Sequence, residues 1–581
     1  MRTYKYMLPL LGMMAAGCSD FFDPETADSL SGDAYMSDLN EMATGYLGVL
    51  TKMQAVGDKE IFLTETRGEM LEPTQQSTAE LIALYNYEDD LSGNSYADPA
   101  PYYDVVIACN DYIENMIEFK ANHPELIEQT AYYDGLLASA IRVKVWAYMT
   151  IGEIYGQAIW FDDPIIKMQD VSNPAIFTRM TMEQITARCV SLLEDGYKGH
   201  SASDNFSWIA WVDPQNVSNI ANSSYRYWDQ MTPPYEALMA KCHIWNAAYK
   251  VQHDQSASAD YKAVCDALLP FLDKQWNSNT HYWKRAGRTS GVLSSIYDYK
   301  TPNQEESVSA IIYDYTKDQT NRLLYHFSDE YPNAFLLTTN EAARLRFEDN
   351  DFDPLGTQTV DQRLGRVTRQ HNGVWYVSKF RPVGSSVRAE AYQDDVHIYT
   401  FRAAELFLWL AEALNHLHRF EALDRVINQG FTSGDYDMLL SLTEDNGEFS
   451  ATVLHEFDGF TTMWACPSSI DRYGMYTGFR TCLTLADVDI WHSDKADATL
   501  DEIVRHNDEL IRNEWVLEFP VEGKTYPNMN RFAEMYKDPA MVSTIIAPKY
   551  EANGQDARIT AKINGQSPVT GLPGYWVPWK L

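Results

Sequence analysis

The sequence predicts a mainly α-helical protein, in which tetratricopeptide-like pairs of antiparallel helices form a scaffold that carries long irregular loops and few short strands. Three observations support this fold class. Long segments place apolar residues three and four positions apart, which is typical of helices with one buried face. Such segments follow one another in pairs, although no strict repeat period is present. Between them lie segments rich in Asn, Asp, Ser, Pro, Gly and aromatic residues.

Helices are predicted wherever the apolar spacing persists. The predicted segments are Asp38–Ala55, Pro101–Lys120, Glu125–Tyr155, Thr181–Asp195, Pro234–Val251, Ala259–Gln275, Ile398–His418, Arg419–Gln429 and Leu500–Phe519. Gly156 should end the third of them, because glycine readily adopts the left-handed conformation that stops a helix. The helical scaffold is thus expected over about residues 30–275 and 395–535.

Three loop-rich regions, about residues 200–232, 276–390 and 431–498, do not show the helical period. Loops of this length are usually functional or disordered, and their aromatic content argues against disorder. The chain from Pro548 onward is expected to be coil packed on the body. No change of composition marks a linker, so residues 18–581 are expected to form one mature domain.

The N-terminus has the organisation of an export signal. Arg2 and Lys5 precede an apolar run that is too short to span a bilayer, and small residues lead to Cys18. This pattern resembles the lipobox of bacterial lipoproteins, with Ala15 in place of the usual leucine. It implies that residues 1–17 are a signal peptide and that Cys18 is acylated. The alternative is a secreted protein with an incidental cysteine.

The chain is strongly acidic, with a formal charge of −36 that becomes −38 once Arg2 and Lys5 leave with the signal peptide. Such a surface repels nucleic acid and anionic lipid head groups. No second apolar stretch is long enough to span a membrane. Any attachment to a membrane is therefore expected through lipid on Cys18.

Cysteine and metal patterns are sparse. No C-x-x-C pair occurs, and Cys466 with Cys482 is the best candidate for a disulfide. Asp349, Asp351 and Asp353 alternate as at the start of a calcium loop, but no acid stands at the twelfth position. A solvated acidic loop is the preferred interpretation. No metal or cofactor is expected, and the chain lacks the H-E-x-x-H, G-x-S-x-G, P-loop and G-x-G-x-x-G motifs.

Motifs spread along the chain resemble one known family. The segment from Arg402 to Leu414 is similar to the "RLAEvyLxyAEAl" helix of the SusD/RagB family of nutrient-binding outer-membrane lipoproteins. Further similarities occur in family order at Tyr103, Ile107 and Asn110, at Tyr155-Gly156, at Asp361–Leu364, at Ser378–Phe380 (a "KY" strand in the family), at Glu514, Glu518, Glu522 and Gly523, and at Asn528–Phe532. Departures occur at Lys144, Trp515 and Thr525, where the family usually has arginine.

The charged residues of these motifs are expected to be structural. Arg402, Glu405 and Glu412 lie on a helix whose remaining faces are apolar, and charges so close to a core are held by pairing or by bonds to loop backbone. Arg402, Glu412, Glu518 and Arg531 are therefore expected to be structural. The resemblance implies instead that ligand is held by aromatic residues in loops, because sugar rings stack on Trp and Tyr. The candidate ligand contacts are Asn94, Tyr96, Trp208, Trp211, Tyr225, Trp228, Tyr282 and Trp283.

The resemblance also implies a function. The implied protein is lipid-anchored in the outer membrane, faces the cell exterior and binds an oligosaccharide or polysaccharide. The ligand would pass to a TonB-dependent outer-membrane barrel of the SusC type, and no catalytic residues are implied. One alternative is the same role for peptides. Another is a secreted glycoside hydrolase on a helical scaffold, because a chain with 82 acidic residues contains paired carboxylates somewhere.

Overall fold

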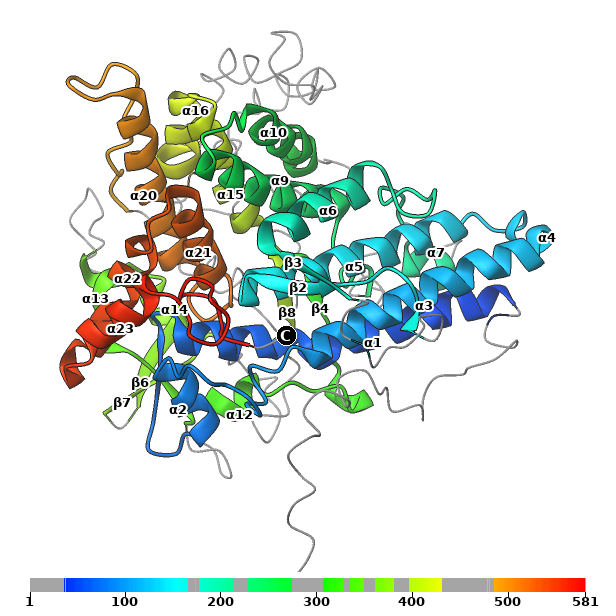
Figure 1. Ribbon diagram of the computed structural model, residues 1–581, viewed down its shortest axis with the longest axis horizontal. Coiled ribbons are helices and arrows are strands. Elements are labelled where there is room, and N and C mark those ends of the chain that lie inside the picture. The colour runs from blue at the N-terminus through cyan, green and yellow to red at the C-terminus, as the bar shows by residue number, and fades with distance from the viewer. Residues whose placement is uncertain are drawn as a thin grey trace, which may run out of the picture.

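A computed structural model describes residue 36 and residues 38–165, 173, 177–212, 228–273, 307–327, 335–349, 361–371, 373–380, 396–430, 478, 480 and 485–579. Helices dominate this part of the chain (Figure 1), and the predicted fold class is confirmed. The longer helices are α1 (Leu39–Arg67), α3 (Ala100–Asn122), α5 (Tyr133–Tyr155), α6 (Met182–Glu194), α9 (Tyr235–Gln252), α10 (Ser258–Asp273), α15 (Ala403–His416), α20 (Leu500–Glu518) and α21 (Thr525–Tyr536).

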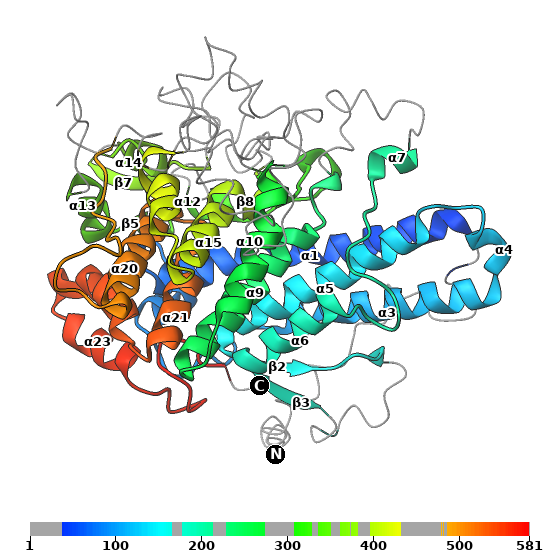
Figure 2. The ribbon, with the colours of Figure 1, turned by 90° about the horizontal axis from the view of Figure 1, so that it is seen from above.

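These helices are arranged largely in chain order. Helices α1, α3 and α5 lie side by side along the long axis of the molecule (Figures 1 and 2). Helices α6, α9, α10, α15 and α20 then follow, each packed against the next. Packing of sequential neighbours is the organisation of a tetratricopeptide-like array. Helix α21 contacts α1, α9 and α20 and so joins the two ends of this array.

Shorter helices connect and flank this array. They are α2 (Ala79–Tyr85), α4 (Pro124–Ile127), α7 (Trp208–Val212), α12 (Leu323–Phe327), α13 (Glu341–Asp349), α14 (Leu364–Val367), α16 (Phe420–Asp424), α22 (Ala540–Ile546) and α23 (Asp556–Asn564). The described residues also include the 3-10 helices η4 (Tyr315–Lys317) and η9 (Ala547–Asn553) and the π-helix η6 (Arg425–Gln429). Among the described helices, none is both long enough and apolar enough to cross a bilayer.

Strands in the described part of the chain form two-stranded antiparallel sheets, of which β1–β5 and β4–β8 join segments that are distant in sequence. The pairs are β1 (Leu71–Pro73) with β5 (Leu337–Thr339), β2 (Gln157–Trp160) with β3 (Thr178–Thr181), β4 (Ser307–Ile311) with β8 (Ile398–Arg402), and β6 (Thr368–His371) with β7 (Val374–Val377). The β4–β8 pair is completely buried, so it belongs to the interior and exposes no edge.

Local sequence signals explain where several helices begin and end. Capping boxes begin α1, α6 and α20, with Asp38 and Glu41, Thr181 and Gln184, and Thr499 and Glu502. Gly156 ends α5 as predicted, with φ of 69°. A Cβ atom at Gly156 would lie 2.8 Å from the Trp576 ring, so glycine is also needed for the C-terminal segment to pack there.

The structure corrects the predicted extent of α1, which was expected to end at Ala55 but continues to Arg67. Charged residues interrupt the apolar pattern in this part of the helix. In the structure Asp58 and Glu65 are buried. Asp58 pairs with Arg322 at 2.9 Å, and one carboxylate oxygen of Glu65 accepts a hydrogen bond from the Gly523 amide at 2.7 Å. Because their partners are distant in sequence, local periodicity could not reveal them.

Other boundaries were also wrong. The predicted helix from Glu125 is two helices, α4 and α5, and the first five residues of the segment from Ile398 form strand β8. Ser378–Phe380 follows β7 and is not a strand. The C-terminal region expected to be coil contains η9 and α23.

Candidate ligand-binding surface

Aromatic side chains gather around α7, the short helix in one of the predicted ligand-facing regions. The Trp208 ring is stacked on Tyr46 of α1, with centroids 6.2 Å apart and planes 13° apart. The edges of Phe206 and Trp228 approach Trp208 at 5.0 and 5.7 Å, at nearly right angles. These pairings are the offset and edge-to-face arrangements that aromatic rings prefer. Two predicted site residues, Trp208 and Trp228, are thereby brought into contact.

The cluster continues outward to the surface. Trp211 lies edge-on to Tyr132 with centroids 5.1 Å apart, and both are half-buried. Trp228 is also half-buried, whereas Trp208 is only 5% exposed, and its indole Nε1 has no hydrogen-bond partner among the described residues. We call Trp208, Trp211 and Trp228 the tryptophan platform. Its two partly exposed rings have the amphipathic character that suits a sugar ligand.

One basic side chain faces the platform among the described residues. The Lys317 ammonium lies 5.5 Å from the Trp228 ring centroid and also pairs with Asp314 at 3.1 Å. Because both groups of this pair are partly exposed, solvent screens its charge. Lys317 therefore contributes a cation–π contact to the ring more than a free charge to a ligand.

Polar side chains anchor the platform to the scaffold. Asp229 accepts hydrogen bonds from the Trp208 amide and, at 2.9 Å, from the Ser207 hydroxyl. The Tyr132 hydroxyl donates to the Ala210 carbonyl at 2.9 Å. Burial raises the pKa of Asp229 to about 6, although the hydrogen bonds it accepts act in the opposite direction.

The buried guanidinium of Arg142 in α5 holds the chain that leads into α7. It donates to the carbonyl oxygens of Ala202 at 3.0 Å and Asp204 at 2.8 Å. Neither Arg142 nor Asp229 was a predicted site residue. Their partners lie far away in sequence, so only the structure could assign them.

Asn94 and Tyr96 have inward-facing roles. The Asn94 side chain closes a turn by accepting from the amides of Tyr96 and Ala97. The Tyr96 hydroxyl is 2.6 Å from His326 Nε2, and the Arg322 guanidinium lies 5.0 Å from the Tyr96 ring centroid. Both Asn94 and Tyr96 are buried, so neither side chain is available to stack on a ligand in this structure.

Other predicted features lie outside the described residues. They are the candidate ligand contacts Tyr225, Tyr282 and Trp283, and the candidate Cys466–Cys482 disulfide. In the acidic run, Asp351 and Asp353 lie outside the described residues, and the side chain of Asp349 is not described. Within the described ranges, no group of three or more His, Cys, Asp or Glu side chains could hold a metal ion.

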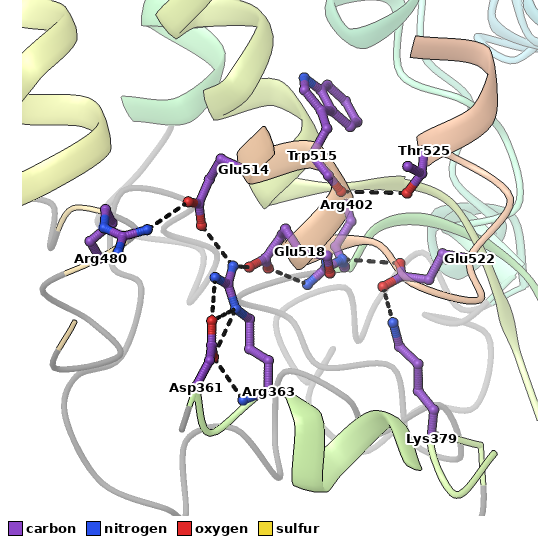
Figure 3. A network of polar contacts seen from close by, with 10 residues as sticks. All are labelled: Asp361, Arg363, Lys379, Arg402, Arg480, Glu514, Trp515, Glu518, Glu522 and Thr525. Atoms are coloured by element: carbon purple, nitrogen blue, oxygen red, sulfur yellow. Dashed lines mark hydrogen bonds and ion pairs between the residues drawn. The ribbon is translucent and has the colours of Figure 1, made fainter. Parts of the chain in front are cut away.

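A buried ionic network joins the family-like motifs (Figure 3). At its centre, Arg363 pairs with Asp361 at 2.7 Å, with Glu514 at 2.7 Å and with Glu518 at 2.9 Å. Arg480 reaches the other oxygen of Glu514 at 3.2 Å. Burial alone would raise the pKa of Glu514, but the two guanidinium groups outweigh it and hold the pKa below its usual range.

The second half of the network is centred on Arg402. This residue pairs with Glu518 at 3.0 Å and Glu522 at 3.2 Å, and Lys379 pairs with Glu522 at 2.5 Å. Each carboxylate in Figure 3 thus has a cationic partner, which is the condition for charges to be tolerated in a core. The predicted structural role of Arg402 and Glu518 is consistent with this pairing and burial.

The remaining predicted structural pair is also buried. Arg531 of α21 binds both carboxylate oxygens of Glu412 of α15, one of them at 2.7 Å.

Residues that depart from the family pattern have their own partners. Lys144 pairs with Asp162 at 2.8 Å, and the Thr525 hydroxyl donates to the carbonyl of Trp515, whose ring packs beside Trp409.

Comparison with known proteins identifies the fold. No family model matches the sequence, and no curated protein matches it. Solved structures do match. A SusD superfamily protein from Bacteroides vulgatus has a TM-score of 0.55 at 10% identity, covering 94% of this chain and 96% of its own.

Two further solved structures are similar over most of the chain. NanU from B. fragilis has a TM-score of 0.52 at 14% identity, with 90% of this chain and 94% of that chain covered. Surface glycan-binding protein A from Bacteroides uniformis has a TM-score of 0.53 at 13% identity, with 87% and 91% covered. The chain therefore has the SusD-like fold, as its motifs predicted.

Proposed function

We propose that this protein is a cell-surface lipoprotein that binds an oligosaccharide or polysaccharide. It delivers this ligand to a TonB-dependent outer-membrane transporter of the SusC type. In this proposal residues 1–17 are removed, acyl chains on Cys18 hold the protein on the outer face of the outer membrane, and residues 18–581 form one domain. The protein acts by binding and has no catalytic residues.

The observation that supports a glycan as the ligand is the tryptophan platform on a SusD-like fold. Trp211 and Trp228 are partly exposed; the buried Trp208 packs against Trp228, and Phe206 packs against both Trp208 and Trp211. Large aromatic side chains that stay partly exposed in one cluster are characteristic of sites that stack sugar rings. One protein with a similar structure is described as a surface glycan-binding protein.

The buried ionic network does not favour a hydrolase. Hydrolysis requires a proton-donating acid and a second carboxylate facing the same glycosidic bond. Glu514 and Glu518 are instead buried and paired with arginines. These carboxylates therefore serve the scaffold in our proposal.

Affinity electrophoresis tests the proposal. The lipid-free chain is run in gels that contain amylopectin, laminarin, xyloglucan, galactomannan or inulin, and a tryptic digest of casein is titrated as the peptide arm. We expect retardation by at least one polysaccharide. Retardation should be lost in Trp228→Ala and kept in Trp375→Ala, which removes a half-buried tryptophan of β7 far from α7 (Figure 2). Binding of the peptides alone would contradict the glycan assignment.

A further inference from the structure

Helix α7 cannot be stable by itself. It contains five residues, and isolated helices of such length do not persist in water because the first turn is costly to form. Yet it carries two members of the tryptophan platform, Trp208 and Trp211. Contacts from other segments must therefore hold the helix and its rings in place.

Asp229 supplies the contact at the start of the helix. Its Oδ1 atom accepts from the Trp208 amide and its Oδ2 atom accepts from the Ser207 hydroxyl at 2.9 Å. The Ser207 hydroxyl in turn accepts from the Ala210 amide at 3.3 Å. These bonds satisfy amide groups that have no partner within the helix, which is the role of an N-cap.

The same residue also fixes the second half of the platform. Asp229 directly follows Trp228, whose ring meets Trp208 edge-to-face at 87°. The hydrogen bond from the Trp208 amide spans 21 positions in the chain, so it clamps together the two backbone segments that carry these indoles. Tyr132 and Arg142 hold other parts of the region, but neither of them joins Trp208 to Trp228.

We propose that Asp229 is a positioning residue for ligand binding, which sets the angle between the Trp208 and Trp228 rings before ligand arrives. This inference rests on the proposed binding function of the platform. A platform that is already ordered loses less conformational freedom on binding, so its affinity is higher for the same contacts. Asp229 itself need not touch the ligand.

Fluorine NMR of the chain labelled with 5-fluorotryptophan tests the positioning role without a ligand. The Trp208 and Trp228 signals are assigned from Trp208→Phe and Trp228→Phe. We expect Asp229→Ala to shift or broaden both signals. Asp229→Asn should restore them, because its amide oxygen can still accept from the Trp208 amide and its NH₂ group can donate to Ser207 Oγ.

A matched control is available in the same molecule. Asp538 accepts from the Ala540 amide at 3.1 Å at the start of α22, which lies far from α7 in Figure 1. Asp538→Ala should leave both fluorine signals in place. If Asp229→Ala impairs folding, Ser207→Ala removes only one bond to Asp229 and should shift the Trp208 signal by a smaller amount. Unchanged Trp208 and Trp228 signals in a folded Asp229→Ala protein would overturn the proposal. If Asp229→Ala does not fold, unchanged signals in Ser207→Ala would overturn it.

Binding gives the second readout. With the polysaccharide that retards the wild type, Asp229→Ala should weaken affinity about two- to tenfold, and Asp229→Asn should recover it. Equal losses in the two variants would contradict a role through hydrogen-bond geometry. If none of the five polysaccharides binds the wild type, the proposed function fails, whereas the fluorine spectra still decide whether Asp229 orders the platform.

Discussion

Arg363 and Glu518 form an ion pair in which neither side chain is exposed, with Nη1 and Oε2 2.9 Å apart across 155 positions of the chain. Glu518 also binds Arg402, so a single carboxylate links the segment before α14, the end of β8 and the end of α20. Loss of this carboxylate would leave two guanidinium groups incompletely paired in the core. Such a loss is far more costly than breaking an exposed pair.

Glu518→Ala should therefore lower the free energy of unfolding by about 3–5 kcal/mol. Arg402→Ala should act in the same direction, because it leaves Glu518 and Glu522 with fewer partners. Urea unfolding followed by circular dichroism measures both. Lys495→Ala is the control, since its pair with Asp489 is exposed and should change stability by about 1 kcal/mol or less. Lost ligand binding with unchanged stability would show that these residues belong to the binding site.

Stability should also depend on pH through His326. Burial of the ring, which packs on Phe62, lowers the pKa of His326 to about 4 from the usual 6.5, although its hydrogen bond to the Arg322 carbonyl acts in the opposite direction. The unfolded chain therefore takes up this proton at higher pH than the folded protein does. The stabilisation is present above pH 6.5 and is lost as pH falls towards 4, by on the order of 3 kcal/mol.

Comparison of the wild type with His326→Gln isolates this contribution. The difference in unfolding free energy between the two proteins should shrink as the pH is lowered from 7 to 4.5, since glutamine does not titrate. Urea unfolding at several pH values measures it. Parallel profiles for the two proteins would mean that His326 is not held neutral in the folded state.

The fold was predictable because helix formation is signalled locally. The apolar stripe of α5 and its stop at Gly156 can be read from neighbouring residues, and both are present in the structure. The part of α1 after Ala55, which was not predicted, depends instead on partners that are distant in sequence. Its C-terminal carbonyls at Thr66 and Gly68 are satisfied by the ammonium group of Lys549, more than 480 positions away. No local pattern reports a partner at such a distance.

The candidate site was predictable only in part, for the same reason. Aromatic loops are visible in the sequence, but the direction of each ring depends on tertiary partners. Tyr96 faces inward because its hydroxyl hydrogen-bonds to His326 and its ring packs against the Arg322 guanidinium. Trp228 instead stays partly exposed and packs edge-to-face with Trp208. Composition alone does not distinguish these outcomes.

Membrane attachment is predicted to depend on one residue. Cys18→Ala should leave folding unchanged but release the protein from membranes, because acyl chains on Cys18 would be its only anchor. Cell fractionation without detergent, with circular dichroism of the released protein, measures this effect. A variant that remains in the outer-membrane fraction of cells lacking the partner transporter would contradict lipid anchoring.

Calorimetric titration of Trp228→Ala at low and high salt tests whether a glycan stacks on the tryptophan platform. The polysaccharide identified by electrophoresis is the ligand, and Trp375→Ala is the control. We predict that Trp228→Ala weakens binding by about 1–3 kcal/mol and that the control binds like the wild type. Salt should have little effect, because a neutral stacked sugar is not subject to Coulomb screening. Wild-type affinity in Trp228→Ala, together with binding that falls steeply with salt, would rule out glycan stacking on the platform and favour a basic peptide ligand.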